Sequence, residues 1–152
     1  MRLYALSAML AFAISALPIA AGQTADGRRT DPGITDGSKQ RRLDRARRDF
    51  RSTGVRSYRY VLSVSCYCPP LSDTIVVRNG RPTAGTDPDL ADEATVPRLF
   101  RKIQRAIDAK VTRITVRYGT RGVPRSIYID SDQRIADDET GYTIARFTPL
   151  KP

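Results

Sequence analysis

The chain has 152 residues, with 26 lysines and arginines against 16 acidic residues, and its formal net charge is +10. It contains no histidine. This absence excludes a Ser-His-Asp triad, a Cys-His pair and an imidazole-ligated metal. The remaining residues form no recognisable catalytic constellation, so we expect a protein that is not an enzyme.

The first 22 residues have the pattern of a secretory signal peptide. Arg2 is the basic start, residues 3–17 form an apolar run, Pro18 ends it, and Ala20–Gly22 suit a signal peptidase. An uncleaved membrane anchor is the alternative, but spanning a bilayer takes about 20 apolar residues. No later stretch approaches that length. We therefore expect signal cleavage, no transmembrane span in the mature chain, and an extracytoplasmic location, either periplasmic or secreted.

Residues 23–37 are polar and offer almost nothing to bury, so we expect a flexible leader there. The rest of the chain, residues 38–150, fits a single domain.

A helix is expected over residues 38–53, with Ser38 as its cap and Gly54 as its stop. Leu43, Ala46 and Phe50 form a narrow apolar side. Residues 38–59 contain nine basic and two acidic side chains, a net charge of +7. Such a run is by default a solvated surface; contact with an anionic membrane face or envelope polymer is the alternative. The residues expected to make that contact are Arg41, Arg42, Arg45 and Arg48.

Residues 57–68 alternate between apolar and polar side chains, which predicts a half-buried strand ended by Pro69-Pro70. Residues 73–78 predict a second strand. Asn79-Gly80 predicts a tight hairpin turn, because both residues tolerate positive φ. The return strand, residues 81–86, contains Pro82 and should therefore lie at a sheet edge.

Cys66 and Cys68 are separated only by Tyr67. In a regular strand their Cα atoms would lie about 6.6–6.8 Å apart, at the outer limit for a disulfide. The chain must therefore bend near Cys68 if the two bond. We expect a local disulfide in an oxidising compartment. A redox role and a soft-metal site for Cu(I) are alternatives.

A second helix is expected over residues 96–109, and strands over 113–118, 125–130 and 142–147. The connections between strands are short, which favours antiparallel pairing. The sequence thus predicts an α+β fold of order α-β-β-β-α-β-β-β. Its antiparallel sheet of five to six strands has two helices packed on one face, and the two halves should resemble each other.

Five carboxylates lie within ten residues of the chain, between the last two strands: Asp130, Asp132, Asp137, Asp138 and Glu139. Oxygen ligands of this kind suit Ca²⁺. The spacing is not that of an EF-hand, because Ile135 and Gly141 occupy its sixth and twelfth positions. The more ordinary interpretation is that the acids cap a turn and pair with nearby arginines. No other cofactor is expected.

Several segments together resemble a family of bacterial exported proteins, domain of unknown function 6174. They are Ser57–Tyr60, Ser65–Pro70, Asn79-Gly80, Thr95-Val96 with Leu99-Phe100, Gly122–Asp130 and Ala136–Tyr142. The resemblance extends from about Arg48 to Phe147. It implies the fold and export, and it implies no activity.

We therefore expect a small non-enzymatic binding or interaction module. Its partner would be a protein or an anionic envelope polymer rather than nucleic acid. The alternatives are a redox or soft-metal-handling protein that uses Cys66 and Cys68, and an exported inhibitor of an enzyme.

Overall fold

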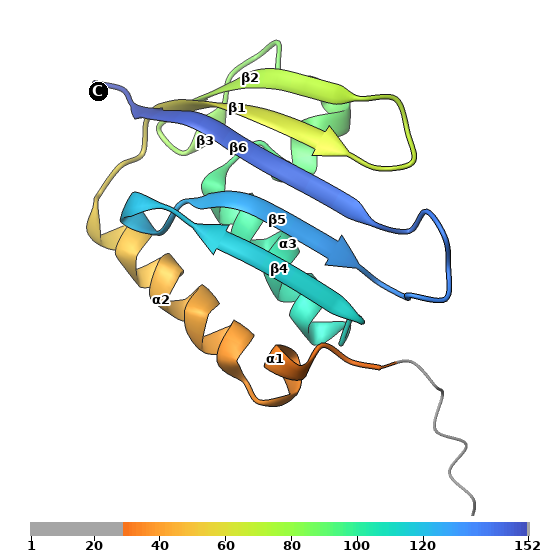
Figure 1. Ribbon diagram of the computed structural model, residues 1–152. Helices are drawn as coiled ribbons and strands as arrows, with labels where there is room; N and C mark the ends of the chain where they lie inside the picture. The colour runs from red at the N-terminus through yellow and green to blue at the C-terminus, as the bar shows by residue number, and fades with distance from the viewer. Residues whose placement is uncertain (1–28, 152) are drawn as a thin grey trace, which may run out of the picture.

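Six strands form one antiparallel sheet in the computed structural model, which describes residues 29–151 (Figure 1). The expected signal peptide, residues 1–22, lies outside the described residues. The helices are α1 (Pro32–Thr35), α2 (Ser38–Ser52) and α3 (Val96–Asp108), with 3₁₀ turns η1 (Pro88–Glu93) and η2 (Thr120–Gly122). The strands are β1 (Tyr58–Ser65), β2 (Leu71–Arg78), β3 (Arg81–Pro82), β4 (Arg113–Tyr118), β5 (Pro124–Asp130) and β6 (Thr140–Pro149).

The strand order is β3-β2-β1-β6-β5-β4, and every pair is antiparallel. Each half of the chain is thus a three-stranded meander, and the first strand of one half pairs with the last strand of the other. This confirms the α+β class, the antiparallel sheet and the arrangement as two similar halves. Asn79 and Gly80 have φ angles of 49° and 80°, so the hairpin turn forms as predicted. β3 lies at the sheet edge, although it is shorter than expected.

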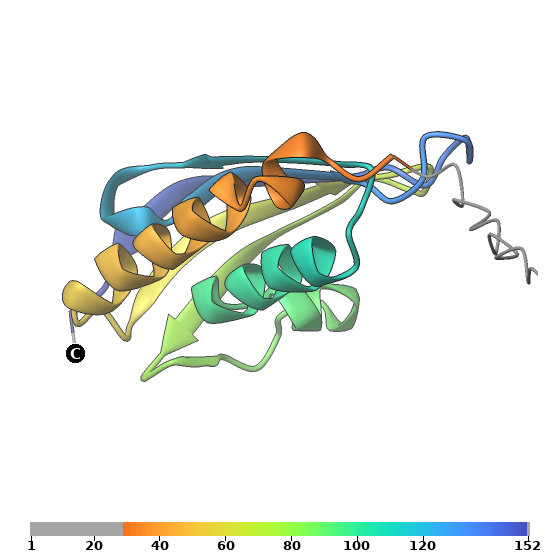
Figure 2. The ribbon, with the colours of Figure 1, turned by 90° about the horizontal axis from the view of Figure 1, so that it is seen from below.

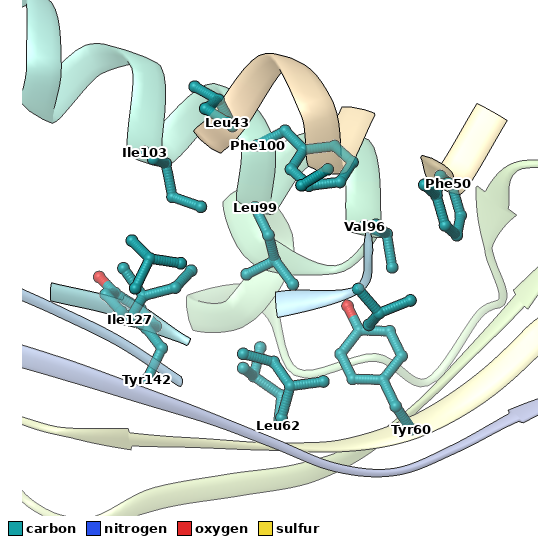
Figure 3. Close-up of a cluster of buried hydrophobic side chains, with 14 of the residues drawn as sticks. Leu43, Phe50, Tyr60, Leu62, Val96, Leu99, Phe100, Ile103, Ile127 and Tyr142 are labelled. Atoms are coloured by element: carbon teal, nitrogen blue, oxygen red, sulfur yellow. The ribbon is translucent and has the colours of Figure 1, made fainter. Parts of the chain in front are cut away.

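The helices α2 and α3 lie on the same face of the sheet (Figure 2). The buried side of α2 consists of Leu43, Ala46 and Phe50, as its periodicity predicts. The buried side of α3 is wider and supplies most of the helix layer. In Figure 3, Leu99 points from α3 toward Leu62 on the sheet. Within residues 29–151, no helix covers the other face of the sheet (Figure 2). None of the helices in this range has the length and apolar composition of a membrane span.

Two buried tyrosines of β1 connect the sheet to the start of α3. The Tyr58 hydroxyl accepts a hydrogen bond from the Val96 backbone N–H at 3.0 Å. The Tyr60 hydroxyl donates to the Glu93 carbonyl at 2.8 Å. Glu93 is itself buried, and its carboxylate pairs with Lys102 at 2.5 Å. Polar groups at this depth require partners, so these bonds set where η1 and α3 sit on the sheet.

The second half of the segment expected to be a flexible leader is ordered, which corrects that prediction for Asp31–Gly37. Asp31 is 5 % exposed and caps α1 by accepting a hydrogen bond from the Gly33 N–H. Its other carboxylate oxygen accepts from the Ile114 N–H of β4 at 2.9 Å. The side chain that anchors this segment, Asp31, is polar. The lack of apolar residues in the segment therefore does not reveal that it is ordered. The predicted cap of α2 is also corrected: its N-cap residue is Gly37, and Ser38 is the first residue of the helix.

We predict that Gly122→Ala is much more destabilising than Gly54→Ala, although both glycines have nearly the same positive φ, 69° and 66°. A Cβ at position 122 would overlap the Ala46 carbonyl of α2, whereas position 54 faces open space. Left-handed backbone alone costs about 1–2 kcal/mol for a residue with a Cβ. We therefore expect a loss of about 3 kcal/mol or more for Gly122→Ala. Thermal unfolding measures the loss of stability in both variants. Equal shifts in melting temperature would contradict the close packing of Gly122 against α2.

Candidate functional site

Cys66 and Cys68 form a disulfide in the loop between β1 and β2, with a Cα–Cα distance of 5.1 Å. β1 ends at Ser65, so the predicted strand to Cys68 is too long by three residues. The bend that the spacing requires is present, because 5.1 Å is shorter than an extended chain allows. The bridge leaves Tyr67 82 % exposed at the loop tip. The outcome is a short, covalently closed loop that displays one aromatic side chain.

The five predicted calcium ligands do not converge on one point. Asp132 accepts hydrogen bonds from the backbone N–H and the guanidinium of Arg134, which is the turn-capping role. Asp137 and Glu139 are exposed. Residues 29–151 contain no group of three or more His, Cys, Asp or Glu side chains placed to hold a metal ion. The predicted calcium site therefore has no assembled ligand set here.

Asp130 and Asp138 are the two acids whose environment is unusual. Asp130 is 5 % exposed, and its Oδ1 has no hydrogen-bond partner in the described part of the chain. Asp138 Oδ1 is likewise buried and unpartnered, while its Oδ2 accepts from the Asp132 N–H at 2.9 Å. Burial raises the pKa of Asp130, and the charges of Asp138 and Glu139 raise it further. Both acids belong to the same end of the sheet, where β5 ends and β6 begins (Figure 1).

The predicted anion-contacting arginines of α2, Arg41, Arg42, Arg45 and Arg48, are all exposed. Arg41 donates to the Asp36 carbonyl at 3.1 Å, and Arg42 lies near the Tyr118 hydroxyl. They lie along α2 rather than around one shared concavity; of the four, Arg42 lines a small cavity of about 40 Å³ with Lys39 and Tyr118. The structure thus places them on a solvated face, and contact with an anionic surface stays a prediction.

A different group of arginines surrounds a notch in the sheet that the sequence did not reveal. β5 pairs with β6 only from Ser126–Thr143 to Ile129–Thr140, while β6 continues to Pro149 with β1 as its strand partner. Pro124, the first residue of β5, has no N–H to donate to a ladder. β5 is also bulged against β4 at this point. The two strands therefore diverge toward the C-terminal end of β6 (Figure 1).

The notch between the diverging strands has a volume of about 410 Å³. Three exposed arginines line it: Arg121 from η2, Arg125 from β5 and Arg146 from β6. The remaining lining residues are small or apolar, and none is acidic: Gly119, Thr120, Val123, Pro124, Ile144, Ala145 and Phe147. Among residues 29–151 these three arginines have no ion pair and no side-chain hydrogen bond. The notch is thus a concave site of uncompensated positive charge.

Two of these arginines have a left-handed backbone conformation, which residues other than glycine rarely adopt. Arg121 has φ 61° and Arg146 has φ 53°. Arg146 belongs to a β-bulge, because β6 places both Arg146 and Phe147 opposite Tyr60 of β1. Bulges re-aim side chains and recur next to functional sites, and left-handed non-glycine residues cost of order 1 kcal/mol each. The rest of the fold must hold these two conformations in place.

A second, smaller concavity adjoins the notch on the open face of the sheet. It measures about 230 Å³ and is lined by Arg59, Tyr60, Val61, Thr74, Arg146 and Thr148. Arg146 lines both concavities, and neither contains a carboxylate. Arg59 is exposed and, within the described residues, has no ion pair. The sequence hides this arrangement, because Arg59, Arg121, Arg125 and Arg146 are scattered over some 90 positions.

These features define the class of protein: a small α+β domain in which a helix-backed antiparallel sheet carries a disulfide-closed hairpin. Residues 42–149 match the model of a family of unknown function, DUF6174, and the chain belongs to that family. The match covers the cysteine loop, the acidic segment and the arginine notch. No curated protein and no solved structure matches the chain.

We predict that Asp130→Asn raises the melting temperature at pH 7. The raised pKa of Asp130 means that the folded state holds its proton more tightly than the unfolded chain does. Ionisation as the pH rises through the folded pKa therefore costs stability. An amide carries no such charge.

The advantage of Asp130→Asn should shrink as the pH falls toward about 3.9, the ordinary value for an unfolded aspartate. Thermal melts between pH 4 and pH 7 measure this, and Asp137→Asn, at an exposed acid of the same loop, is the control. A lower melting temperature for Asp130→Asn at pH 7 would contradict the prediction.

Proposed function

We propose that this protein is a non-enzymatic, extracytoplasmic binding module that holds an anionic ligand in the notch between β5 and β6. The observation that supports the proposal is the set of three arginines, Arg121, Arg125 and Arg146, around a concavity without a carboxylate. A guanidinium offers several N–H donors in a planar fork that matches carboxylate and phosphate oxygens. Positive charge in a concave site also steers anions toward it.

The location is part of the same proposal. A disulfide persists in oxidising compartments outside the cytoplasm, and the Cys66–Cys68 bridge fits that setting. The expected signal peptide of residues 1–22 supports the same location. Outside the cytoplasm, the anions available to a basic notch belong to the cell envelope, to the medium or to other secreted proteins.

We predict that inorganic phosphate binds at the notch and that the double variant Arg121→Gln/Arg125→Gln weakens this binding at least tenfold. Loss of charge-assisted hydrogen bonds, each worth about 1.5–3 kcal/mol, is the reason. A phosphate titration followed by backbone amide NMR should shift residues 119–123, 125 and 144–147 most. Arginine keeps its charge across the physiological pH range. The contribution of the three arginines to phosphate affinity should therefore not vary between pH 6 and pH 9.

The matched control is Arg101→Gln/Arg105→Gln, which removes the same charge from the exposed side of α3, where neither arginine lines the notch. We expect it to change the phosphate affinity less than twofold. If both double variants weaken binding equally, the effect is that of net charge and the notch is not the site. If phosphate shifts no amide near the notch, the proposal fails outright.

A second candidate function uses the loop of Cys66 and Cys68. The disulfide lies at a surface loop with Cys68 exposed, so small thiols can reach it. That exposure favours a redox role or, after reduction, soft-metal binding through two thiolates. The same closed loop displays Tyr67, which suits insertion into a partner such as an enzyme to be inhibited. We rank these roles second, because a structural bridge accounts for the same geometry.

We predict that the protein isolated without reductant has no thiol that iodoacetamide can label, because the bridge is structural. The double variant Cys66→Ser/Cys68→Ser should then bind phosphate as the unmodified chain does. Mass spectrometry before and after labelling measures the first expectation, and the NMR titration measures the second. Two labelled thiols that also take up Cu(I) would favour the second candidate function instead.

A further inference from the structure

We infer that the ligand of the notch is an extended chain of linked phosphate groups, which continues past Arg146 into the concavity beside Arg59. This inference rests on the proposed function, because the notch holds one part of the chain. It adds the chemical class of the ligand and a second contact region. Four lines of observation carry it.

The two concavities are adjacent rather than separate. Both are lined by Arg146, whose left-handed backbone at the β6 bulge puts it between them. On one side the notch has Arg121 and Arg125, and on the other side the open face has Arg59. A ligand that leaves the notch past Arg146 therefore meets a further guanidinium at once.

The arginines at the two ends do not converge on one small anion. Arg59 belongs to β1 and Arg125 to β5, with β6 between them. Two strand intervals amount to about 10 Å, and the divergence of β5 from β6 adds to this. The Arg125 side chain also packs against Gly119, at the end of β4, which flanks β5 on the side away from β6. Separate anionic groups are needed to satisfy both ends.

The chemistry along this path suits phosphate. The concavity beside Arg59 adds the exposed side chain of Thr74 to the two arginines, whereas the Thr148 hydroxyl already donates to the Arg146 carbonyl at 3.1 Å. Hydroxyl groups donate to phosphate oxygens alongside guanidinium groups, and a phosphate has enough acceptor oxygens for both. No Asp or Glu lines either concavity, so no repulsion interrupts the path.

The charge distribution favours one end of the sheet as the place where such a chain binds. The five acids of residues 130–139 lie where β5 ends and β6 begins, and the notch lies at the opposite end of the same two strands. A polyanion is thus attracted to one end of the β5–β6 pair and repelled from the other. Two aromatic side chains line the concavities, but Phe147 is half-buried against Tyr58, with ring centroids 5.2 Å apart, and Tyr60 is buried. This leaves little aromatic surface on which nucleobases could stack, so we expect a chain without bases.

The experiment compares inorganic phosphate with linear polyphosphate of about 15 units on the full mature chain, by calorimetry and amide NMR. We expect polyphosphate to bind about 100-fold more tightly, because a linked second contact raises the effective concentration. Its affinity should also fall more steeply with added salt. Polyphosphate should shift amides around Arg59 and Thr148 in addition to those of the notch.

Arg59→Gln separates this inference from the proposed function. It should leave phosphate binding at the notch unchanged and weaken polyphosphate binding about tenfold. Arg117→Gln is the matched control, because Arg117 is an exposed arginine of β4 that lines neither concavity. We expect Arg117→Gln to change either affinity less than twofold.

Four outcomes would overturn the inference. Polyphosphate that binds no more tightly than phosphate would show that the site takes a single anion, with the proposed function intact. Equal losses in Arg59→Gln and Arg117→Gln would show a response to net charge alone. Oligothymidylate with the same number of phosphates should bind more weakly than polyphosphate, and tighter binding would assign the site to nucleic acid. If phosphate itself fails to bind at the notch, the proposed function fails as well.

Discussion

The hydrogen bonds of Tyr58 and Tyr60 with the η1–α3 junction determine how the helix layer meets the sheet. Both side chains are 1 % exposed, and their hydroxyls bond the Val96 N–H and the Glu93 carbonyl. Apolar packing alone tolerates sliding between layers, whereas a buried hydroxyl without its partner loses its compensation for desolvation. These two bonds therefore select one position for α3. With α3 in that position, α2 and α3 cover the same face, and no helix of residues 29–151 covers the opposite face, where Arg59 is exposed.

The notch depends on irregularities that a regular sheet would remove. A ladder between β5 and β6 that continued past Ser126 would close the space, and Pro124 with the neighbouring bulge prevents this. A regular β6 would also aim Arg146 elsewhere. Such departures from ideal geometry lower stability slightly, and they persist where the surrounding structure fixes them. Here α2 provides that support, since Gly122 of η2 packs directly against the Ala46 carbonyl.

Much of the fold could be predicted because its signals are local. Alternation in residues 57–65, the Asn79-Gly80 turn and the helix expected over residues 96–109 each lie within one element, and all three are confirmed. Predictions failed where a contact distant in sequence decides the outcome. Asp31 looks like a leader residue until Ile114 of β4 donates to it. The predicted end of β1 was wrong for a local reason instead. Cys66 and Cys68 continue the alternation in sequence, but the bridge between them, with a sequence separation of 2, requires a bend that ends the strand at Ser65.

The candidate site, like the fold, has some features that the sequence determines and others that only the tertiary structure decides. The amino-acid sequence by itself determined that the chain is basic, has no histidine, carries a closely spaced cysteine pair and alternates as an antiparallel sheet backed by helices. These are properties of composition and of short-range periodicity. Only the tertiary structure decided which of the many arginines surround a concavity. Arg59, Arg121, Arg125 and Arg146 come together because β1, β5 and β6 are neighbours in the sheet. Their grouping depends on strand pairing over long separations and on two left-handed backbones, neither of which has a pattern in the linear sequence.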